Sequence, residues 1–240
     1  QTMMSSKTLK PLYGNTLSEL QQICAAEGMP RFAAKQIAGW LYRRGVTEID
    51  QMSDLSKANR AKLAESYCIG LTAPVKVSTS TDGTKKYLYR TSEGAAIESA
   101  YIPDGERATL CVSSQAGCRM GCRFCATGRQ GLQHSLSTTE ITNQIFSIPE
   151  SERLTNLVFM GMGEPLDNYD QVLTFLKTLA RPGGVNIGMR HVSLSTCGLV
   201  DGIYRLMEEQ IPLTLSISLH APNDEIRSRS MPVNKRWPIE

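Results

Sequence analysis

The second half of the chain alternates between short apolar segments typical of strands and longer segments with helical spacing. The predicted strands are 108–113, 157–160, 191–196 and 213–219. The predicted helices are 137–148, 169–180 (ending near Pro182-Gly183), 200–209 and 223–230. A repeated strand–helix–strand order is typical of a parallel sheet whose strands are joined by crossover helices. The alternation therefore predicts an α/β fold for this half.

The first hundred residues have a different pattern. Residues 1–70 are predicted to form three short helices, the first opened by a capping box of Thr16 and Glu19 and the third covering about 56–67. From 71 to 103 the apolar period changes to two, and Asp82-Gly83 indicates a hairpin turn. We therefore expect a helical unit, then a short β segment, ahead of the α/β part.

Composition narrows the class of protein. Hydrophobic residues make up 41% of the chain and no apolar run approaches the roughly 18 residues of a membrane span, so a globular protein is indicated. The seven cysteines are an odd number with no secretory signal before them, which argues against a disulfide framework. The net charge of +3 arises within residues 1–70, which hold nine basic and six acidic residues. Charge alone favours a solvated face there.

Three cysteines lie within eight positions, just after the first predicted α/β strand. They are Cys118, Cys122 and Cys125. Three thiolates in one short loop suit a cubane iron–sulfur cluster with one iron left open. We expect Arg119, Arg123 and Arg129 to lower the pKa values of these thiols. A closed zinc site is the alternative, with His134 or Cys111 as its fourth ligand.

The next three strands also end in polar or glycine-rich segments. These are 160–165, 195–198 and 218–223. Glycines in the first of them allow the backbone to approach a ligand closely, and Glu164 offers an acceptor for an ammonium group. Because α/β barrels carry their active sites at the carboxyl ends of the strands, the sequence predicts one shared site there.

The cysteine spacing is typical of the radical S-adenosylmethionine superfamily, and longer stretches resemble the RlmN/Cfr family within it. The stretches are 107–118, 160–165 and 218–225, with the strand end Tyr101-Ile102-Pro103. The resemblance implies a partial (β/α) barrel of the radical S-adenosylmethionine type. It divides the chain into a helical accessory domain at 1–70, a β-hairpin segment at 71–103 and the first four β/α units of the core at 104–240.

The resemblance also implies a role for particular residues. A [4Fe-4S] cluster would be held by Cys118, Cys122 and Cys125. S-adenosylmethionine would be bound by Gly163, Glu164, Ser195, Ser218, Leu219 and His220. Glu98 would accept a proton, and Cys111 would resolve a covalent adduct between protein and RNA.

The implied reaction is methylation of adenine C2 in large-subunit ribosomal RNA and in transfer RNA, through a methylated cysteine. The target base would be unstacked into the site. RNA phosphates would meet basic residues of the accessory domain, namely Arg31, Lys35, Arg43 and Arg44. We expect a cytoplasmic monomer without a membrane contact, served by an electron donor such as flavodoxin.

One feature of the family has no counterpart here. The family carries the methyl group on a cysteine near its C-terminus, whereas the last cysteine of this sequence is Cys197, which is a poor substitute. We therefore expect the chain to be an N-terminal portion of such an enzyme. Two alternatives stay open, a methyltransferase for adenine C8 and a non-catalytic iron–sulfur protein that binds RNA.

Overall fold

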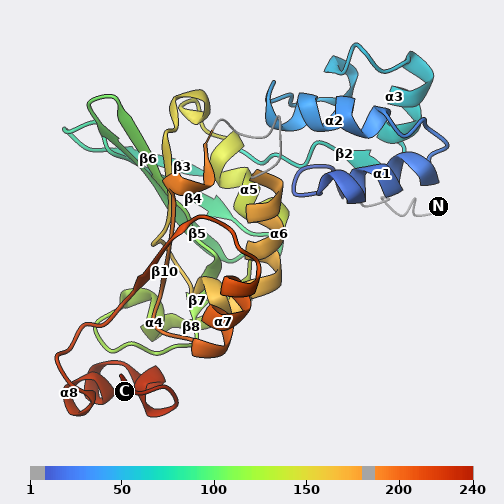
Figure 1. Cartoon of the computed structure of the whole chain (residues 1–240). Helices are drawn as coiled ribbons and strands as arrows, with labels where there is room; N and C mark the ends of the chain where they lie inside the picture. Colours follow the sequence, from blue (N-terminus) through green and yellow to red (C-terminus); the bar gives the residue numbers. More distant parts are fainter. Residues whose placement is uncertain (1–8, 180–186, 240) are drawn as a thin grey trace, which may run out of the picture.

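The computed structural model describes residues 9–179 and 187–239, which form a helical N-terminal module beside a larger α/β part (Figure 1). One seven-stranded sheet, in the order β11-β10-β9-β6-β5-β4-β3, organises the larger part. Its strands are β3 (Lys76–Thr79), β4 (Lys85–Arg90), β5 (Ala96–Asp104), β6 (Arg107–Cys111), β9 (Asn156–Phe159), β10 (Val192–Thr196) and β11 (Thr214–Ile217). Strands β6, β9, β10 and β11 are parallel, so the predicted parallel sheet is confirmed.

Helices cover one face of this sheet (Figure 1). They are α5 (Thr138–Phe146), α6 (Tyr169–Leu179) and α7 (Val200–Glu208). Alternate residues of the strands, such as Leu110, Leu157 and Leu194, are fully buried beneath them, as a period of two requires. Phe159 meets Phe175 of α6 edge to face, with ring centroids 5.6 Å apart. The predicted end of that helix at 180 and the Pro182-Gly183 turn lie outside the described residues.

The segment before the parallel strands belongs to the same sheet. Strands β3 and β4 form the predicted hairpin, with Gly83 in the turn at φ +85°. Strand β5 continues through Pro103, where the sequence predicted its end, and pairs antiparallel with β6 so that Ala100 lies opposite Cys111. The antiparallel strands therefore extend the sheet at its β6 edge.

A small hairpin between β6 and α5 was not predicted from the sequence. It consists of β7 (Gln115–Cys118), α4 (Ala126–Gln130) and β8 (Gly131–Ser135). At the bulge in β7, Gly117 has φ +74°, and a Cβ there would lie 1.8 Å from the carbonyl oxygen of Gly131. Only glycine fits this crossing, which places Cys118 at the end of β7.

The N-terminal module has its own core and packs on α5. Its elements are β1 (Lys10–Pro11), α1 (Leu17–Ala26), α2 (Ala33–Tyr42), α3 (Lys57–Ala64) and β2 (Tyr67–Cys68). The capping box of Thr16 and Glu19 is present, whereas the third helix ends at 64 because the next residues pair with β1. Phe146 of α5 contacts the rings of Tyr13 and Tyr42, and this contact joins the two cores.

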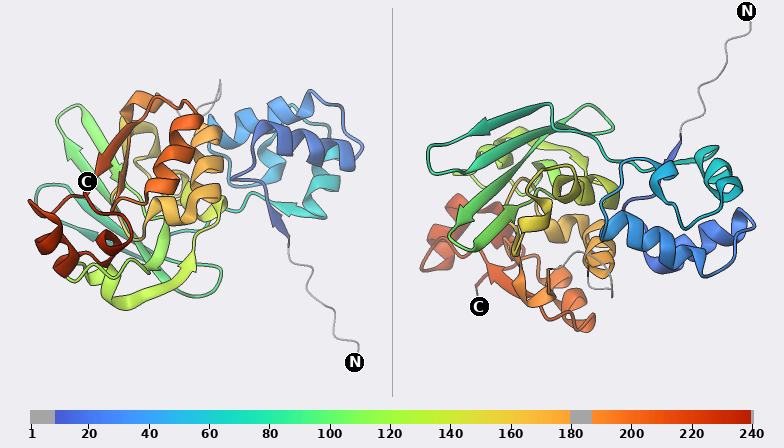
Figure 2. Two further views of the ribbon diagram at one scale, coloured as in Figure 1. Left: turned by 60° about the horizontal axis from the view of Figure 1, so that its bottom comes forward. Right: turned by 90° about the horizontal axis from the view of Figure 1, so that it is seen from above.

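Helix α8 (Asp224–Ser230) follows β11, and five 3-10 helices complete the described elements. They are η1 (Ile49–Gln51), η2 (Ser151–Arg153), η3 (Pro165–Asn168), η4 (Met189–His191) and η5 (Pro232–Lys235). The views in Figures 1 and 2 place α4 and α8 at the end of the sheet opposite to the helical module. None of the helices in residues 9–179 and 187–239 is long and apolar enough to span a lipid bilayer.

Candidate functional site

The three cysteines lie in a loop, here called the cysteine loop (residues 118–125), between β7 and α4. Cys118 is the last residue of β7 and is 8% exposed. Cys125 stands directly before α4, and its N–H donates to the carbonyl of Cys122 over 3.1 Å. The hairpin, the tight turn and the helix start thus hold all three residues within one short stretch of backbone.

Burial controls the ionisation of these thiols. It raises the pKa of Cys118 to about 11, and the nearby charges of Glu164, Cys122 and Cys125 act in the same direction. Burial followed by the charge of Cys125 also raises the pKa of Cys122. Without a bound cation, both thiols are therefore neutral near pH 7. Metal binding would displace their protons, which is the usual coupling at thiolate sites.

The arginines of the cysteine loop do not lower these pKa values, so that prediction is wrong. Arg119 instead forms a 2.8 Å ion pair with Asp167 of η3. Arg129 donates to the backbone carbonyl of Arg123 over 3.2 Å. The pKa of Cys122 is raised by burial and by the charge of Cys125, and the charge of Arg227 of α8 only partly offsets this rise.

The described residues do not show the ligand arrangement of a closed zinc site. Within the described ranges, no group of three or more His, Cys, Asp and Glu side chains is arranged to hold one ion, as a closed zinc site requires. His134 lies 2.8 Å from Glu140 and 3.2 Å from Glu93, so both ring nitrogens have partners. A cubane binds each thiolate through a different iron atom, so its ligands need not meet at one point.

The loop after β9 packs directly against β7. Gly163 has φ +97°, and a Cβ there would lie 2.5 Å from the Cβ of Gln115. The side-chain oxygen of Gln115 accepts the N–H of Glu164 over 2.9 Å, and its amide donates to Asp167 over 2.8 Å. Gln115, which sequence reasoning missed, therefore ties the cysteine hairpin to the loop that carries Glu164.

Glu164 is 4% exposed and connects two strand ends. Its carboxylate accepts the N–H of Cys197, after β10, over 2.8 Å and the N–H of Leu166 over 3.1 Å. Burial raises its pKa despite these hydrogen bonds. The side chains of Thr196 and Cys197 also hydrogen-bond to this carboxylate, so a bound ammonium group would share its oxygens with donors of the protein.

The face of the sheet away from α5, α6 and α7 carries the remaining predicted residues. Ser195 and Ser218 approach to 3.2 Å between their hydroxyl oxygens. Cys111 lies opposite Ala100 of β5 and Val158 of β9, and alternation puts Glu98 on the same face. The Glu98 carboxylate is half exposed and forms a 3.3 Å ion pair with Lys86.

The end of β11 meets the cysteine loop. His220 has the left-handed φ of +55°, which is uncommon for a residue other than glycine. Its ring lies against Phe124 of the cysteine loop, with centroids 4.7 Å apart, and Leu219 beside it is 48% exposed. The structure thus brings the cysteine loop, Glu164 and the ends of β10 and β11 together. Glu98 lies farther along the uncovered face, on β5.

Two family models match the chain. The Radical SAM superfamily model matches residues 112–238, and the model for the N-terminal domain of ribosomal RNA large subunit methyltransferases matches residues 11–69.

Individual relatives match over nearly the whole chain. A probable dual-specificity RNA methyltransferase RlmN of Bacteroides fragilis is 50% identical over 230 residues, 96% of this chain and 67% of the relative. The RlmN of Geotalea uraniireducens is 45% identical over 94% of this chain and 65% of its own length. The crystal structure of a radical SAM methyltransferase from Sphaerobacter thermophilus gives a TM-score of 0.89 at 42% identity, covering 96% of this chain and 69% of that one. The chain spans about two thirds of the length of the curated relatives it matches.

Proposed function

Because the chain belongs to the RlmN family of radical S-adenosylmethionine RNA methyltransferases, we propose that it methylates adenine C2 in large-subunit ribosomal RNA and in transfer RNA. The observation that carries this proposal is the convergence of the cysteine loop, Glu164 and the ends of β10 and β11 at one end of the parallel sheet. Parallel α/β sheets place their ligands at this end of the strands.

We propose that Cys118, Cys122 and Cys125 bind a [4Fe-4S] cluster. When bound, such a cluster would supply the electron for cleavage of S-adenosylmethionine. The protein's part is to hold three thiolates on the β7–α4 turn and to keep the site largely buried. Burial favours the neutral thiols, so cluster assembly on this loop releases protons.

We propose that S-adenosylmethionine lies across the strand ends. Gly163 lets the loop that carries Glu164 lie directly against Gln115, and its backbone would border the cofactor. Glu164 would accept from the amino group, and Ser195 and Ser218 offer hydroxyl groups from neighbouring strands. Leu219 and His220 follow Ser218 and extend the proposed binding surface toward the cysteine loop. The contact of the His220 ring with the cysteine loop would bring a ligand on β11 close to the cluster.

The uncovered face of the sheet offers groups for the later steps. We propose that Glu98 accepts a proton and that Cys111 resolves the covalent adduct with RNA. The carboxylate of Glu98 is half exposed and pairs with Lys86, so it is accessible from solvent. Cys111 shares this face, where an unstacked adenine could reach both side chains.

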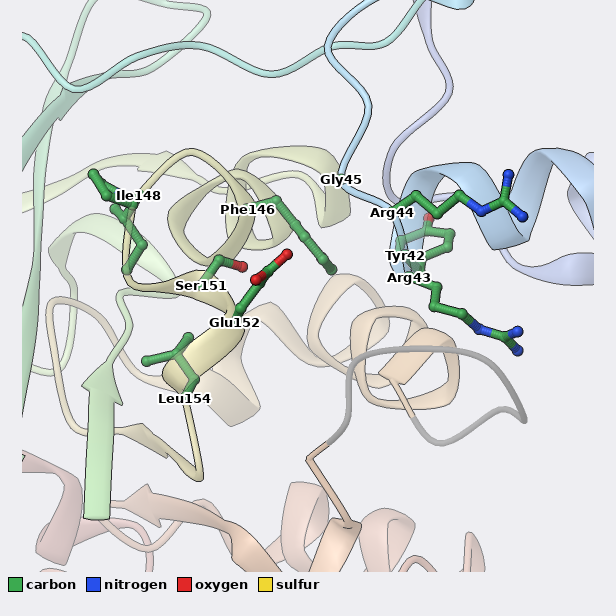
Figure 3. A pocket seen from close by; sticks show the side chains of 10 residues that line it. Tyr42, Arg43, Arg44, Gly45, Phe146, Ile148, Ser151, Glu152 and Leu154 are labelled. Atoms are coloured by element: carbon green, nitrogen blue, oxygen red, sulfur yellow. The ribbon is translucent and has the colours of Figure 1, made fainter. Parts of the chain in front are cut away.

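We propose that the helical module, residues 1–70, is an accessory domain that contacts RNA. Four of its bases form no ion pair with a carboxylate in the described parts of the chain, namely Arg31, Lys35, Arg43 and Arg44. Arg43 and Arg44 contribute to the lining of a pocket of about 400 Å³ that also includes Glu152, and Figure 3 shows both guanidinium groups directed away from Glu152. The guanidinium of Arg44 lies 4.0 Å from the centre of the Trp40 ring. Both arginines are exposed, and exposed guanidinium groups suit phosphate groups. We further propose a cytoplasmic monomer that receives electrons from a donor such as flavodoxin.

The test uses a bacterial strain that lacks 2-methyladenosine and expresses the complete gene to which this sequence belongs, because the methyl-carrying cysteine expected for the family has no counterpart among residues 1–240. Mass spectrometry of ribosomal and transfer RNA should detect 2-methyladenosine, and Cys122→Ala should abolish it while Cys24→Ala does not. Detection of 8-methyladenosine instead would assign the enzyme to C8. An intact cluster with no cleavage of S-adenosylmethionine would favour a non-catalytic RNA-binding protein.

The RNA contact has a separate test. The double variant with alanine at Arg43 and Arg44 should bind RNA more weakly than the parent protein. The slope of log affinity against log salt concentration should fall by about one for each lost phosphate contact. An unchanged slope would remove these two residues from the RNA interface.

A further inference from the structure

A buried guanidinium connects the ends of two neighbouring strands at the proposed site. Arg227 of α8 is 3% exposed. Its Nη2 donates to the carbonyls of Cys197, over 2.6 Å, and Ser218, over 3.3 Å. Its Nε donates to the carbonyl of Leu219 over 3.1 Å. One side chain therefore fixes the backbone after β10 and the backbone after β11 relative to each other.

The remaining donors of Arg227 hold the segment that follows α8. Its Nη1 donates to the side-chain oxygen of Asn234 over 2.6 Å and reaches the carbonyl of Trp237 at 3.5 Å. Asn234 is itself 2% exposed and donates to Asp224 at the start of α8 over 2.9 Å. The position of the guanidinium is thus determined by contacts on both sides of it.

Every one of these acceptors is uncharged. In the part of the chain that the structure describes, Arg227 forms no ion pair, and the Oδ1 of Asp224, at the start of the same helix, accepts from Asn234 and Ile239 instead. A buried charge without a counter-charge is costly.

We infer that Arg227 is a positioning residue for S-adenosylmethionine binding, whose planar guanidinium holds the ends of β10 and β11 in register. The inference rests on the proposed function, because it takes Ser195 and Ser218 through His220 as the cofactor-binding edge. Lysine has the same charge but lacks the rigid fork of donors that reaches three carbonyls at once. The role therefore requires arginine and not simply a positive charge.

The test compares Arg227→Lys and Arg227→Gln with the matched control Arg229→Gln. Arg229 lies on the same helix, but it is exposed and pairs with Glu225. The first measurement is hydrogen exchange in the metal-free protein at two reporter amides. These are the N–H of Cys197, bonded to Glu164, and the N–H of Ser218, bonded to the carbonyl of Thr196.

Both Arg227 variants should speed exchange at both reporter amides, whereas the Arg229 variant should not. The second measurement, after anaerobic reconstitution, is the dissociation constant for S-adenosylmethionine at matched iron content. It should rise roughly tenfold or more in both Arg227 variants, the scale of one lost charge-assisted hydrogen bond. Because Arg227→Lys keeps the charge, it remains informative where Arg227→Gln does not fold.

Exchange and affinity in Arg227→Lys equal to those of the control would overturn the inference. Faster exchange with an unchanged dissociation constant would show that Arg227 holds the two strand ends together, and it would refute the role in cofactor binding. A parent protein that binds no S-adenosylmethionine would refute the proposed function and the positioning role with it. In that case the exchange measurement alone would still show whether Arg227 holds the two strand ends.

Discussion

Replacing Glu164 by alanine should destabilise the protein even when no cofactor is bound. The Glu164 carboxylate accepts the buried N–H groups of Cys197 and Leu166, at 2.8 and 3.1 Å. Alanine would leave both amides without an acceptor, and no water can reach a side chain position that is 4% exposed without local opening. The variant therefore separates the role of Glu164 in the fold from its proposed role in cofactor binding.

The expected size follows from these two contacts. A buried amide left unsatisfied costs about 1–3 kcal/mol, so two give about 2–6 kcal/mol. Burial raises the pKa of Glu164, which means that the carboxylate carries a desolvation penalty that alanine relieves. The net loss of unfolding free energy should therefore lie toward the lower end, about 2–4 kcal/mol. Glu164→Gln retains one acceptor oxygen and should lose about half as much.

Urea denaturation of the metal-free protein at pH 7 measures this loss. The control is Glu225→Ala, an exposed carboxylate paired with Arg229, which should change stability by less than about 1 kcal/mol. After reconstitution, Glu164→Ala should weaken binding of S-adenosylmethionine about ten- to a hundredfold while iron content changes little. If Glu164→Ala loses no more stability than the Glu225 variant, the Glu164 carboxylate does not stabilise the fold by accepting the two buried N–H groups.

Three further results are expected. Alanine at any position of the C-x3-C-x2-C motif should abolish iron and sulfide incorporation, whereas Cys24→Ala should not; full iron occupancy in a motif variant would contradict the site. Burial opposes the charge of His134, but hydrogen bonds and charges from Glu140 and Glu93 outweigh it and raise the pKa of His134. The charged ring therefore stabilises the fold fully below about pH 6.5, and this stabilisation is lost as the pH rises through the raised pKa. His134→Gln should therefore reduce the unfolding free energy more at pH 6 than at pH 9, and a pH-independent loss would argue against the charged pair. Gly163→Ala should disrupt the loop after β9, because its Cβ would meet Gln115 at 2.5 Å, and it should lower both stability and cofactor affinity; a parent-like melting temperature would contradict this crowding.

Features that depend on neighbours in the chain were predictable from the sequence. The capping box of Ser137 and Glu140 forms as expected, because its two residues are three positions apart. The strand–helix alternation from 108 onward also predicted the parallel sheet, since each element carries its own apolar period. The C-x3-C-x2-C motif indicated the loop at the end of the sheet for the same reason: its ligands lie within eight residues.

The tertiary structure decided what depends on contacts between distant segments. Burial raises the pKa values of Cys118 and Cys122, and Arg227, about a hundred residues away in the sequence, only partly offsets the rise at Cys122. Arg119, beside Cys118, pairs instead with Asp167. Arg227 itself has no sequence signal, because its bond to Cys197 spans 30 positions and exists only when β10, β11 and α8 are assembled. Local periodicity and capping are encoded within a few residues, whereas burial and the pairing of charges with backbone groups arise only from packing.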